Sequence, residues 1–409
     1  MANFLLVGGR FDLDVSAGSI CIRNIVLELK KRGHNIFVIT NSWEKDNYQE
    51  KWGAKIYGIK DGLYTRIVER FGDKKGFKSI FFKIISLLRF ISLFPFYPIV
   101  SRFRYYRIKK LAVKLIKKDN IDALICFCGY TECVYCGVKI KQSLKNKIKV
   151  VNYHLDLLSQ RNKKITNINI LQRKMKKFLS EEFNTVDAVF LPESFENIWN
   201  LKGTIHLVGF PVCIEDENAN ERFDVSFSKD VINVAYIGSL DVVNRNPEYV
   251  LKTISSYNCQ NKKKIHLHVW GMIDDQIRES FNQFECVSYR GLIESKFSMD
   301  LLKQADFILN IGNAITFQML PSKIFKSFLS GKPILNFVKK ENDASLKYFD
   351  QYGHSLSIFE FNNDENFNRQ LFAHFIDDNN GKNFEVPKQL VEHNTPRYIV
   401  NKIEEVVNI

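Results

Sequence analysis

Short apolar runs alternate with amphipathic helical segments along almost the whole chain, and this alternation constrains the fold more than any other feature. The run 3–9 ends in two glycines, and a helical pattern over 19–34 leads to a second apolar run over 35–40. Short apolar runs of this kind are typical of buried parallel strands. Lys30, Lys31 and Arg32 precede Gly33, which is how helices commonly end. The start of the chain therefore predicts a βαβ unit.

The same alternation continues in two series. Further strands are expected within 122–128, 147–154, 187–192 and 205–211, and after the acidic stretch 213–224 a second series of strands and helices begins at 232. Two such series separated by one polar linker favour an α/β protein with two Rossmann-like, doubly wound parallel-sheet domains facing across a cleft. We assign the N-terminal domain to 1–212 and the C-terminal domain to 213–390. A last helix over 391–409 is expected to pack back on the N-terminal domain.

The net charge of the chain limits the classes of molecule that it is expected to bind. Lys and Arg number 59 against 45 Asp and Glu, which gives a net charge of +14. Such a field favours phosphates, nucleic acid or an anionic membrane surface. No nucleic-acid-binding module is recognisable, so nucleic acid is not an expected partner. The sequence shows no signal-peptide pattern, and no apolar run reaches the ~18 residues that span a bilayer. We therefore expect a cytoplasmic protein, peripheral at the inner face of the plasma membrane.

The segment 74–118 departs from the α/β pattern. An almost wholly apolar helix with one narrow polar stripe is expected over 78–93, and a helix with eight cations follows Pro98. One interpretation is a helix buried in the N-terminal domain followed by a solvated basic helix. The other is an interfacial helix with a basic collar on an anionic membrane, where each cation contributes about 1 kcal/mol.

A helix expected to open with Pro321, Ser322 and Lys323 is the first candidate for a binding site. Proline suits the first helical position, and free N–H groups, a hydroxyl and an ammonium together favour an anion. The helix follows the strand expected at 306–312, at the edge of the sheet where ligands bind in open α/β folds. Helices that begin with Pro-Ser are nonetheless common for structural reasons alone.

The N-terminal domain offers candidates at two strand ends. Gly9, Ser16 and Gly18 belong to the first strand-to-helix loop, where backbone N–H groups can face a bound substrate or a phosphate. His154 and Asp156 follow a buried strand, and either can act as a base. A lone histidine at a strand end is more often structural. Further candidate bases in the first loop are Asp12 and Asp14.

Four cysteines stand close together in the sequence, at Cys126, Cys128, Cys133 and Cys136. Four thiolates can bind zinc, but the usual pair of C-x2-C motifs is missing. Cysteine also packs as a small apolar side chain in protein cores. We therefore predict buried thiols and no metal site.

Several segments in order along the chain resemble GT-B glycosyltransferases, particularly glycosyltransferase family 4. They are "FLLVGGRFDLDVSAGSICIRNIVLELKKRGHNIFVIT", "IHLVGFP", "VAYIGSLDVVNRNPEYVL", "YRGLIESKFSMDLLKQADFILN" and "PSKIFKSFLSGKPIL". The resemblance implies the GT-B fold. Gly238, Ser239 and Arg245 match the loop that meets the donor diphosphate, and the planar guanidinium of Arg245 suits phosphate oxygens. His154 matches a histidine that lines the cleft near the donor sugar.

The last segment departs from the family in one respect. The family carries two glutamates eight positions apart on this helix, where the first contacts the donor and the second accepts hydrogen bonds from the ribose. The matching positions here are Gln318 and Lys326. Glutamine keeps an acceptor, whereas lysine cannot accept at all. Lys326 can pair with a phosphate or an acidic donor sugar, or it can point to solvent.

The resemblance implies a hexosyltransferase-type enzyme, retaining and metal-independent. It would move a sugar from a UDP or GDP sugar, its only co-substrate, to an acceptor hydroxyl. We expect the acceptor to be a lipid-linked or other saccharide in capsule or other cell-surface polysaccharide synthesis. Because the two glutamates are replaced, a non-catalytic GT-B-like subunit that binds a partner or membrane is the alternative.

Overall fold

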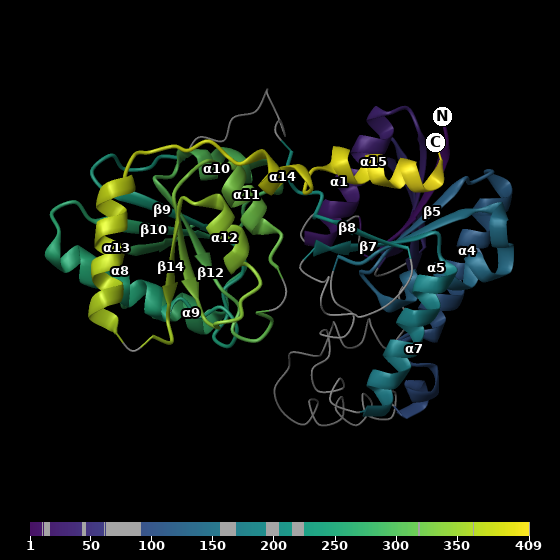
Figure 1. Ribbon diagram of the computed structural model, residues 1–409, viewed down its shortest axis with the longest axis horizontal. Coiled ribbons are helices and arrows are strands. Elements are labelled where there is room, and N and C mark those ends of the chain that lie inside the picture. The colour runs from purple at the N-terminus through teal and green to yellow at the C-terminus, as the bar shows by residue number, and fades with distance from the viewer. Residues whose placement is uncertain are drawn as a thin grey trace. The chain divides into compact units, whose positions relative to one another are not determined.

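The computed structural model describes residues 1–9, 11, 17–42, 46–60, 62, 91–155, 169–193, 204–214, 225–317, 320–362 and 364–408. Contacts between residues divide the chain into two units. The first consists of Met1–Pro211 together with Pro396–Ile409, and the second of Val212–Thr395. Figure 1 shows helices packed around one sheet in each unit.

The first unit is built on an eight-stranded sheet with the order β3-β4-β2-β1-β5-β6-β7-β8. Neighbouring strands are parallel except β3 and β4. The strands are β1 (Asn3–Val7), β2 (Asn35–Ser42), β3 (Asn47–Lys51), β4 (Ala54–Lys60), β5 (Ala123–Phe127), β6 (Lys149–Tyr153), β7 (Ala188–Pro192) and β8 (Ile205–Val208).

Helices that follow the strands cover this sheet. The helices are α1 (Ala17–Lys31), η1 (Phe94–Phe96), α4 (Arg102–Lys118), α5 (Thr131–Leu144), η2 (Lys145–Lys147), α7 (Asn169–Thr185) and α15 (Pro396–Val407). Gly33 takes a φ of 83° after α1, and the amide of His34 bonds the carbonyl of Leu29. The predicted end of this helix is confirmed, because glycine adopts this left-handed conformation without steric cost.

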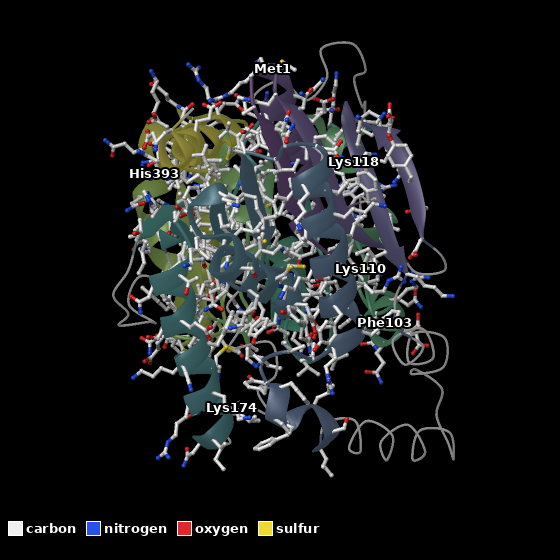
Figure 2. All side chains as sticks on the ribbon, turned by 90° about the vertical axis from the view of Figure 1, so that its right-hand side faces the viewer. Met1, Phe103, Lys110, Lys118, Lys174 and His393 are labelled. Carbon is white, nitrogen blue, oxygen red and sulfur yellow. The ribbon has the colours of Figure 1, made fainter. Side chains whose placement is uncertain are left out.

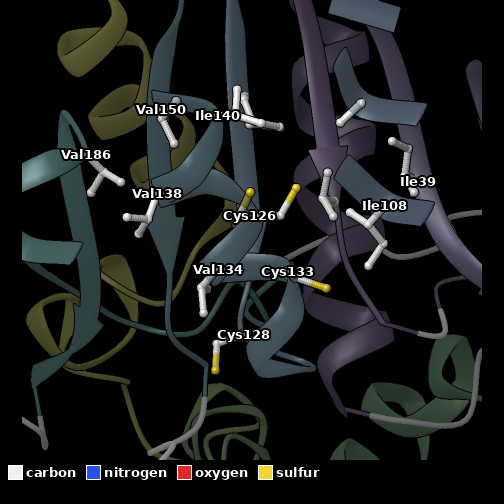
Figure 3. Packing of buried hydrophobic residues seen from close by; sticks show 14 of the residues in the cluster. Ile39, Ile108, Cys126, Cys128, Cys133, Val134, Val138, Ile140, Val150 and Val186 are labelled. Carbon is white, nitrogen blue, oxygen red and sulfur yellow. The ribbon is translucent and has the colours of Figure 1, made fainter. Parts of the chain in front are cut away.

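The core between α4, α5, α7 and the sheet contains the four clustered cysteines. Cys126, Cys128, Cys133 and Cys136 are fully buried free thiols among aliphatic side chains (Figure 3). The prediction of buried thiols is confirmed.

The antiparallel hairpin of β3 and β4 does not follow from the alternating pattern. The strand β3 is polar and mostly exposed, so it carries no strong hydrophobic signal. Trp52 and Gly53 connect the two strands with φ angles of 54° and 71°. Two consecutive positive φ angles are the mark of a tight hairpin turn.

The second unit holds a six-stranded parallel sheet with the order β11-β10-β9-β12-β13-β14. This is the doubly wound order, in which the chain reverses direction across the sheet between β9 and β12. The strands are β9 (Ile232–Ile237), β10 (Ile265–Trp270), β11 (Val287–Tyr289), β12 (Phe307–Ile311), β13 (Ile334–Val338) and β14 (Ser355–Phe359). The helices are α8 (Glu248–Gln260), α9 (Asp275–Phe281), η4 (Ser295–Phe297), α10 (Ser298–Gln304), α11 (Lys323–Leu329), α12 (Leu346–Tyr352), α13 (Glu365–Asn379) and α14 (Lys388–Glu392). The predicted α/β class with two parallel-sheet units is confirmed.

The last helix, α15, packs against α1 in the first unit. Its Glu404 carboxylate accepts hydrogen bonds from Arg32 and His34, and the Arg32 guanidinium also reaches the carbonyl of Arg397. The side chains of Ile399, Val400 and Ile403 are buried. The chain thus returns to the first unit after it has completed the second.

Of the segment 74–118, the structure describes residues 91 onward. The eight cations lie on α4, as Figure 2 indicates for Lys110 and Lys118, but they are not all solvated. Arg104 is buried, lies 4.0 Å from the ring centroid of Tyr130 and pairs with Glu132 at 3.8 Å. The described helices include none that is long and apolar enough to cross a membrane.

Candidate functional site

The reversal point of the second sheet brings two loops together. The strands β9 and β12 are neighbours, so the residues after Ile237 and after Ile311 leave the sheet at the same edge. In doubly wound folds this edge is where ligands bind. Gly238 and Ser239 follow β9, whereas Gly312 and Asn313 follow β12.

Arg245 bridges these two loops. Its Nε donates to Oδ1 of Asn313 at 2.7 Å, and its Nη1 donates to Oγ of Ser239 at 3.2 Å. Asn313 is buried and also accepts from Nδ2 of Asn244 at 3.1 Å. The guanidinium is therefore held by neutral acceptors, and it keeps further N–H groups for a ligand.

Lys323, the first residue of α11, reaches the same edge of the sheet. Its Nζ lies 4.2 Å from the ring centroid of Tyr236 and donates to the Tyr236 hydroxyl at 3.1 Å. That hydroxyl donates in turn to the carbonyl of Ser239 at 2.9 Å. A Cβ at Gly238 would stand 2.7 Å from the Lys323 Nζ. Because glycine has no side chain, the Nζ of Lys323 can lie close to the backbone at position 238.

The electrostatics of this cluster favour an anion. No carboxylate among the described residues lies within ion-pair distance of Lys323 or Arg245. Burial and the charge of Arg245 hold the pKa of Lys323 well below its ordinary value. Burial raises the pKa of Tyr236 to about 12, so the phenol stays neutral. A lysine and an arginine that form no ion pair with a carboxylate of the described residues are suited to bind a phosphate or another anion.

The beginning of α11 differs from the prediction. Pro321 precedes the helix instead of opening it, and Ser322 is the capping residue, with no capping bond from its side chain. The amides of Ile324 and Phe325 bond the carbonyls of Pro321 and Ser322. The expectation that free first-turn amides bind the anion is therefore wrong for these two groups, because the turn satisfies them itself. The predicted cation, Lys323, does lie in the cluster.

Lys326 points away from this cluster. Its Nζ donates to Oγ of Ser295 at 3.3 Å and to Oγ of Ser298 at 3.2 Å, at the start of α10. The interpretation in which this lysine points to solvent is therefore wrong. Its predicted partner in the motif, Gln318, lies outside the described residues.

The first unit has a reversal point of its own, between β1 and β5. A Cβ at Gly9 would stand 3.2 Å from the ring of Tyr130, and one at Gly129 would stand 3.1 Å from the Gly9 amide nitrogen. The two loops touch here because both positions lack a side chain. Gly18 lies in the first turn of α1, and nothing is within 4 Å of the place where its Cβ would be.

His154 is fully buried at the end of β6. Its Nε2 lies 2.8 Å from Oε1 of Glu182, a buried residue of α7 that also accepts from Asn152 at 2.6 Å. Burial lowers the pKa of His154, but the Glu182 carboxylate and the Cys128 thiol override that effect and raise it above its ordinary value. An imidazole held as a cation has no lone pair with which to act as a base.

The remaining candidates of the first unit, Asp12, Asp14, Ser16 and Asp156, lie outside the described residues. Sequence reasoning missed Tyr236 and Asn313, which hold the two cations in place. The sequence "NIGN", in which a polar side chain follows an apolar strand and a glycine, is a signal for Asn313. In the described ranges, no group of three or more His, Cys, Asp or Glu side chains is arranged to hold a metal ion.

Comparisons with known proteins agree with this architecture. The chain matches no family model and no curated protein. Among solved structures it is similar to the sucrose-phosphate synthase of Thermosynechococcus elongatus, with a TM-score of 0.59 and 12% identity over 100% of this chain and 94% of that one. The E. coli trehalose-6-phosphate structure bound with UDP-2-fluoro glucose gives a TM-score of 0.61 and 10% identity over 100% and 99%. Anabaena Alr3699/HepE in complex with UDP and glucose gives 0.53 and 8% over all of both chains. Identity this low shows the fold alone, and the fold of this chain is that of the GT-B glycosyltransferases.

Proposed function

We propose that this protein is a glycosyltransferase that moves a sugar from a nucleotide-diphosphate sugar to an acceptor hydroxyl. The observation that carries the proposal is the convergence of Lys323 and Arg245 at the reversal point of the second sheet, with no ion-paired carboxylate in the described part of the chain. Similar folds hold UDP-2-fluoro glucose in one structure and UDP with glucose in another.

The cluster suits the chemistry of this transfer. As the bond between the sugar and the diphosphate breaks, negative charge grows on the departing phosphate oxygens. An ammonium and a guanidinium fixed in advance at that place stabilise the charge as it develops. Because the two cations can supply the positive charge that a divalent ion supplies in other transferases, we propose that transfer needs no metal. Retention of the sugar configuration is proposed only from the resemblance to family 4.

Lys326 is proposed to lie at the nucleoside end of the donor. Together with the hydroxyls of Ser295 and Ser298, it offers donors where a glutamate of the resembling family accepts from the ribose. This change favours a donor with an additional anionic or acceptor group. It is also the observation that favours the second candidate function, a GT-B-like subunit that binds nucleotide without transferring a sugar.

We propose a lipid-linked saccharide of cell-surface polysaccharide synthesis as the acceptor, reached at the inner face of the membrane. An exposed apolar group around η1 and the start of α4 supports this partner, and its members are Ile91, Phe96, Val100, Phe103 and Tyr106. Arg102 lies 4.1 Å from the ring centroid of Phe96, and Lys174 of α7 donates to the carbonyl of Phe94. Apolar side chains flanked by cations are suited to an anionic lipid surface. Figure 2 shows Phe103 and Lys174 on these two helices.

Donor binding is tested by thermal melting of the full-length protein with UDP, GDP and a panel of their sugars. We expect stabilisation by one nucleotide, and Arg245→Met should abolish most of it. Hydrolysis or transfer of the matching sugar separates the enzyme from the non-catalytic subunit. Failure of every nucleotide and nucleotide sugar to shift the melting temperature would refute the proposal.

Membrane docking is tested separately, by sedimentation with vesicles of neutral and anionic lipid. The double variant Phe103→Ser, Tyr106→Ser should lose binding to the anionic vesicles. Leu292→Ser, which removes an apolar side chain of the second unit that is even more exposed than Phe103 and Tyr106, is the control. Equal sedimentation of the two variants would count against the membrane surface.

A further inference from the structure

The side chain of Lys323 ends among groups that do not balance a positive charge. The face and hydroxyl of Tyr236 lie on one side, and the space left by Gly238 lies on another. A ring face attracts an ammonium, but more weakly than a buried carboxylate does. Tyr236 therefore fixes the position of the Lys323 amine but compensates a positive charge on it only weakly.

The charged and titratable groups around Lys323 come from β9, the loop after β9, α11 and the segment after β13. Tyr236 of β9 is a neutral phenol, and Arg245 of the following loop is a cation. Lys326, one turn further along α11, is engaged with serines of η4 and α10. The carboxyl group of Asp343, after β13, interacts electrostatically with Arg245, and it accepts hydrogen bonds from the amide and hydroxyl of Ser345. Tyr236 is the hydrogen-bond partner of Lys323, and none of these described groups forms an ion pair with it.

We propose that binding of a nucleoside diphosphate at this site takes up one proton from solvent, and that Lys323 is the group that accepts it. The inference rests on the proposed function, because it concerns the same anion site. In the ligand-free protein, burial and the nearby Arg245 guanidinium disfavour the ammonium form and hold the pKa of Lys323 well below its ordinary value. A diphosphate beside it brings opposite charge and favours the ammonium form.

Tyr236 is the positioning residue in this arrangement. Its hydroxyl accepts from the Lys323 Nζ and donates to the Ser239 carbonyl, so the amine is held in place in either protonation state. Because protonation needs no movement of the side chain, we expect proton uptake to accompany binding directly.

The proposal predicts the direction in which the affinity for the ligand changes with pH. Where the pH lies between the pKa of the free site and that of the occupied site, the complex binds one more proton than its components. Affinity must then rise as the pH falls, by up to about tenfold per pH unit. Lys323→Arg carries a permanent charge and should bind with no such dependence.

The experiment is isothermal titration of the full-length protein with UDP-glucose and GDP-mannose, at about pH 8, in Tris and in HEPES. A nucleotide sugar is the appropriate probe because its phosphates lack the second ionisation near pH ~6 of a phosphate monoester. The two buffers release protons with different heats, so the difference in observed enthalpy measures the protons taken up. We expect uptake of about half to one proton by the wild type and none by Lys323→Arg.

Each outcome decides one of the two proposals. If no nucleotide or nucleotide sugar binds the wild-type protein, the proposed function fails. If a nucleotide sugar binds with the same enthalpy in both buffers, the proton coupling is wrong and the proposed function stands. If Lys323→Arg binds and still takes up a proton, another group is responsible and the assignment to Lys323 is wrong. If that variant does not fold, the affinity of the wild type for the nucleotide sugar is measured between about pH 7 and pH 9. An affinity that does not change with pH excludes the proton coupling.

Discussion

Asn313→Asp should weaken nucleotide binding without unfolding the protein. Oδ1 of Asn313 accepts from Nε of Arg245 at 2.7 Å and from Nδ2 of Asn244 at 3.1 Å, and an aspartate of the same shape keeps both bonds. The amide that is lost makes only a 3.4 Å contact with the carbonyl of Thr316. The substitution therefore adds a negative charge beside Arg245 at little structural cost.

The size of the effect follows from the distance between the new charge and the ligand. A phosphate that contacts the guanidinium would lie about 6 Å from the carboxylate, and two like charges at that distance repel by roughly 3 kcal/mol at an effective dielectric constant of about 20. Salt at about 0.15 M and partial solvent exposure of the ligand reduce this to about 1–2 kcal/mol. Affinity for UDP should fall about tenfold.

The matched control is Asn246→Asp, in the same loop. Its Oδ1 accepts from the amide of Glu248, the first residue of α8, and the carboxylate of aspartate can accept the same bond. Calorimetric titration with UDP and a melting curve are measured for both variants. If Asn313→Asp melts like the wild type and binds UDP with the same affinity, the placement of the phosphate beside Arg245 is wrong.

Three further outcomes are expected. Gly238→Ala places a Cβ 2.7 Å from the Nζ of Lys323 and 3.1 Å from the hydroxyl of buried Tyr236, so both side chains must shift. UDP affinity should fall several-fold, with a modest loss of melting temperature; unchanged affinity would count against the cluster. Glu182→Gln removes the carboxylate bonded to buried His154, and urea unfolding should show that the free energy of unfolding falls by about 3–5 kcal/mol. Adding His154→Gln should recover part of this loss. A Glu182→Gln variant as stable as the wild type would contradict the ion pair. Burial lowers the pKa of His268 to about 3, so between about pH 6.5 and pH 3 the unfolded chain binds a proton there that the folded protein does not. The free energy of unfolding should therefore fall as the pH drops through this range. His268→Gln should flatten this part of the acid unfolding curve, and equal slopes for the two proteins would contradict the assignment.

The alternation of apolar runs and helical segments predicted most strands of both sheets, because buried parallel strands are short apolar runs in the sequence. In the second unit β9 begins at the predicted residue 232, and β12 lies within the predicted range 306–312, whereas β14 was not predicted. The pattern could not predict β3, because an exposed polar edge strand has no hydrophobic period.

Within the candidate site, local sequence could identify the cations but not what holds them. Lys323 was identified from its place at a predicted helix start, and Arg245 from the resemblance to the GT-B enzymes. Their partners Asn313 and Tyr236 come from 68 and 87 residues away along the chain, and only the sheet order brings them together. For the same reason the burial of His154 could not be predicted: Glu182 lies 28 residues further on.

Lys323 finally illustrates why such a cluster must be explained by a ligand. Burying an amine beside a guanidinium costs stability, whether the amine stays charged and is repelled or gives up its proton. A methionine of similar length would fill the same space against the ring of Tyr236 at no such cost. Lys323→Met should therefore raise the melting temperature of the ligand-free protein, by an amount that corresponds to about 1 kcal/mol, and should remove most of the stabilisation by UDP. A lower melting temperature for the variant would mean that the lysine stabilises the fold, and the cluster would then need no anion to account for it.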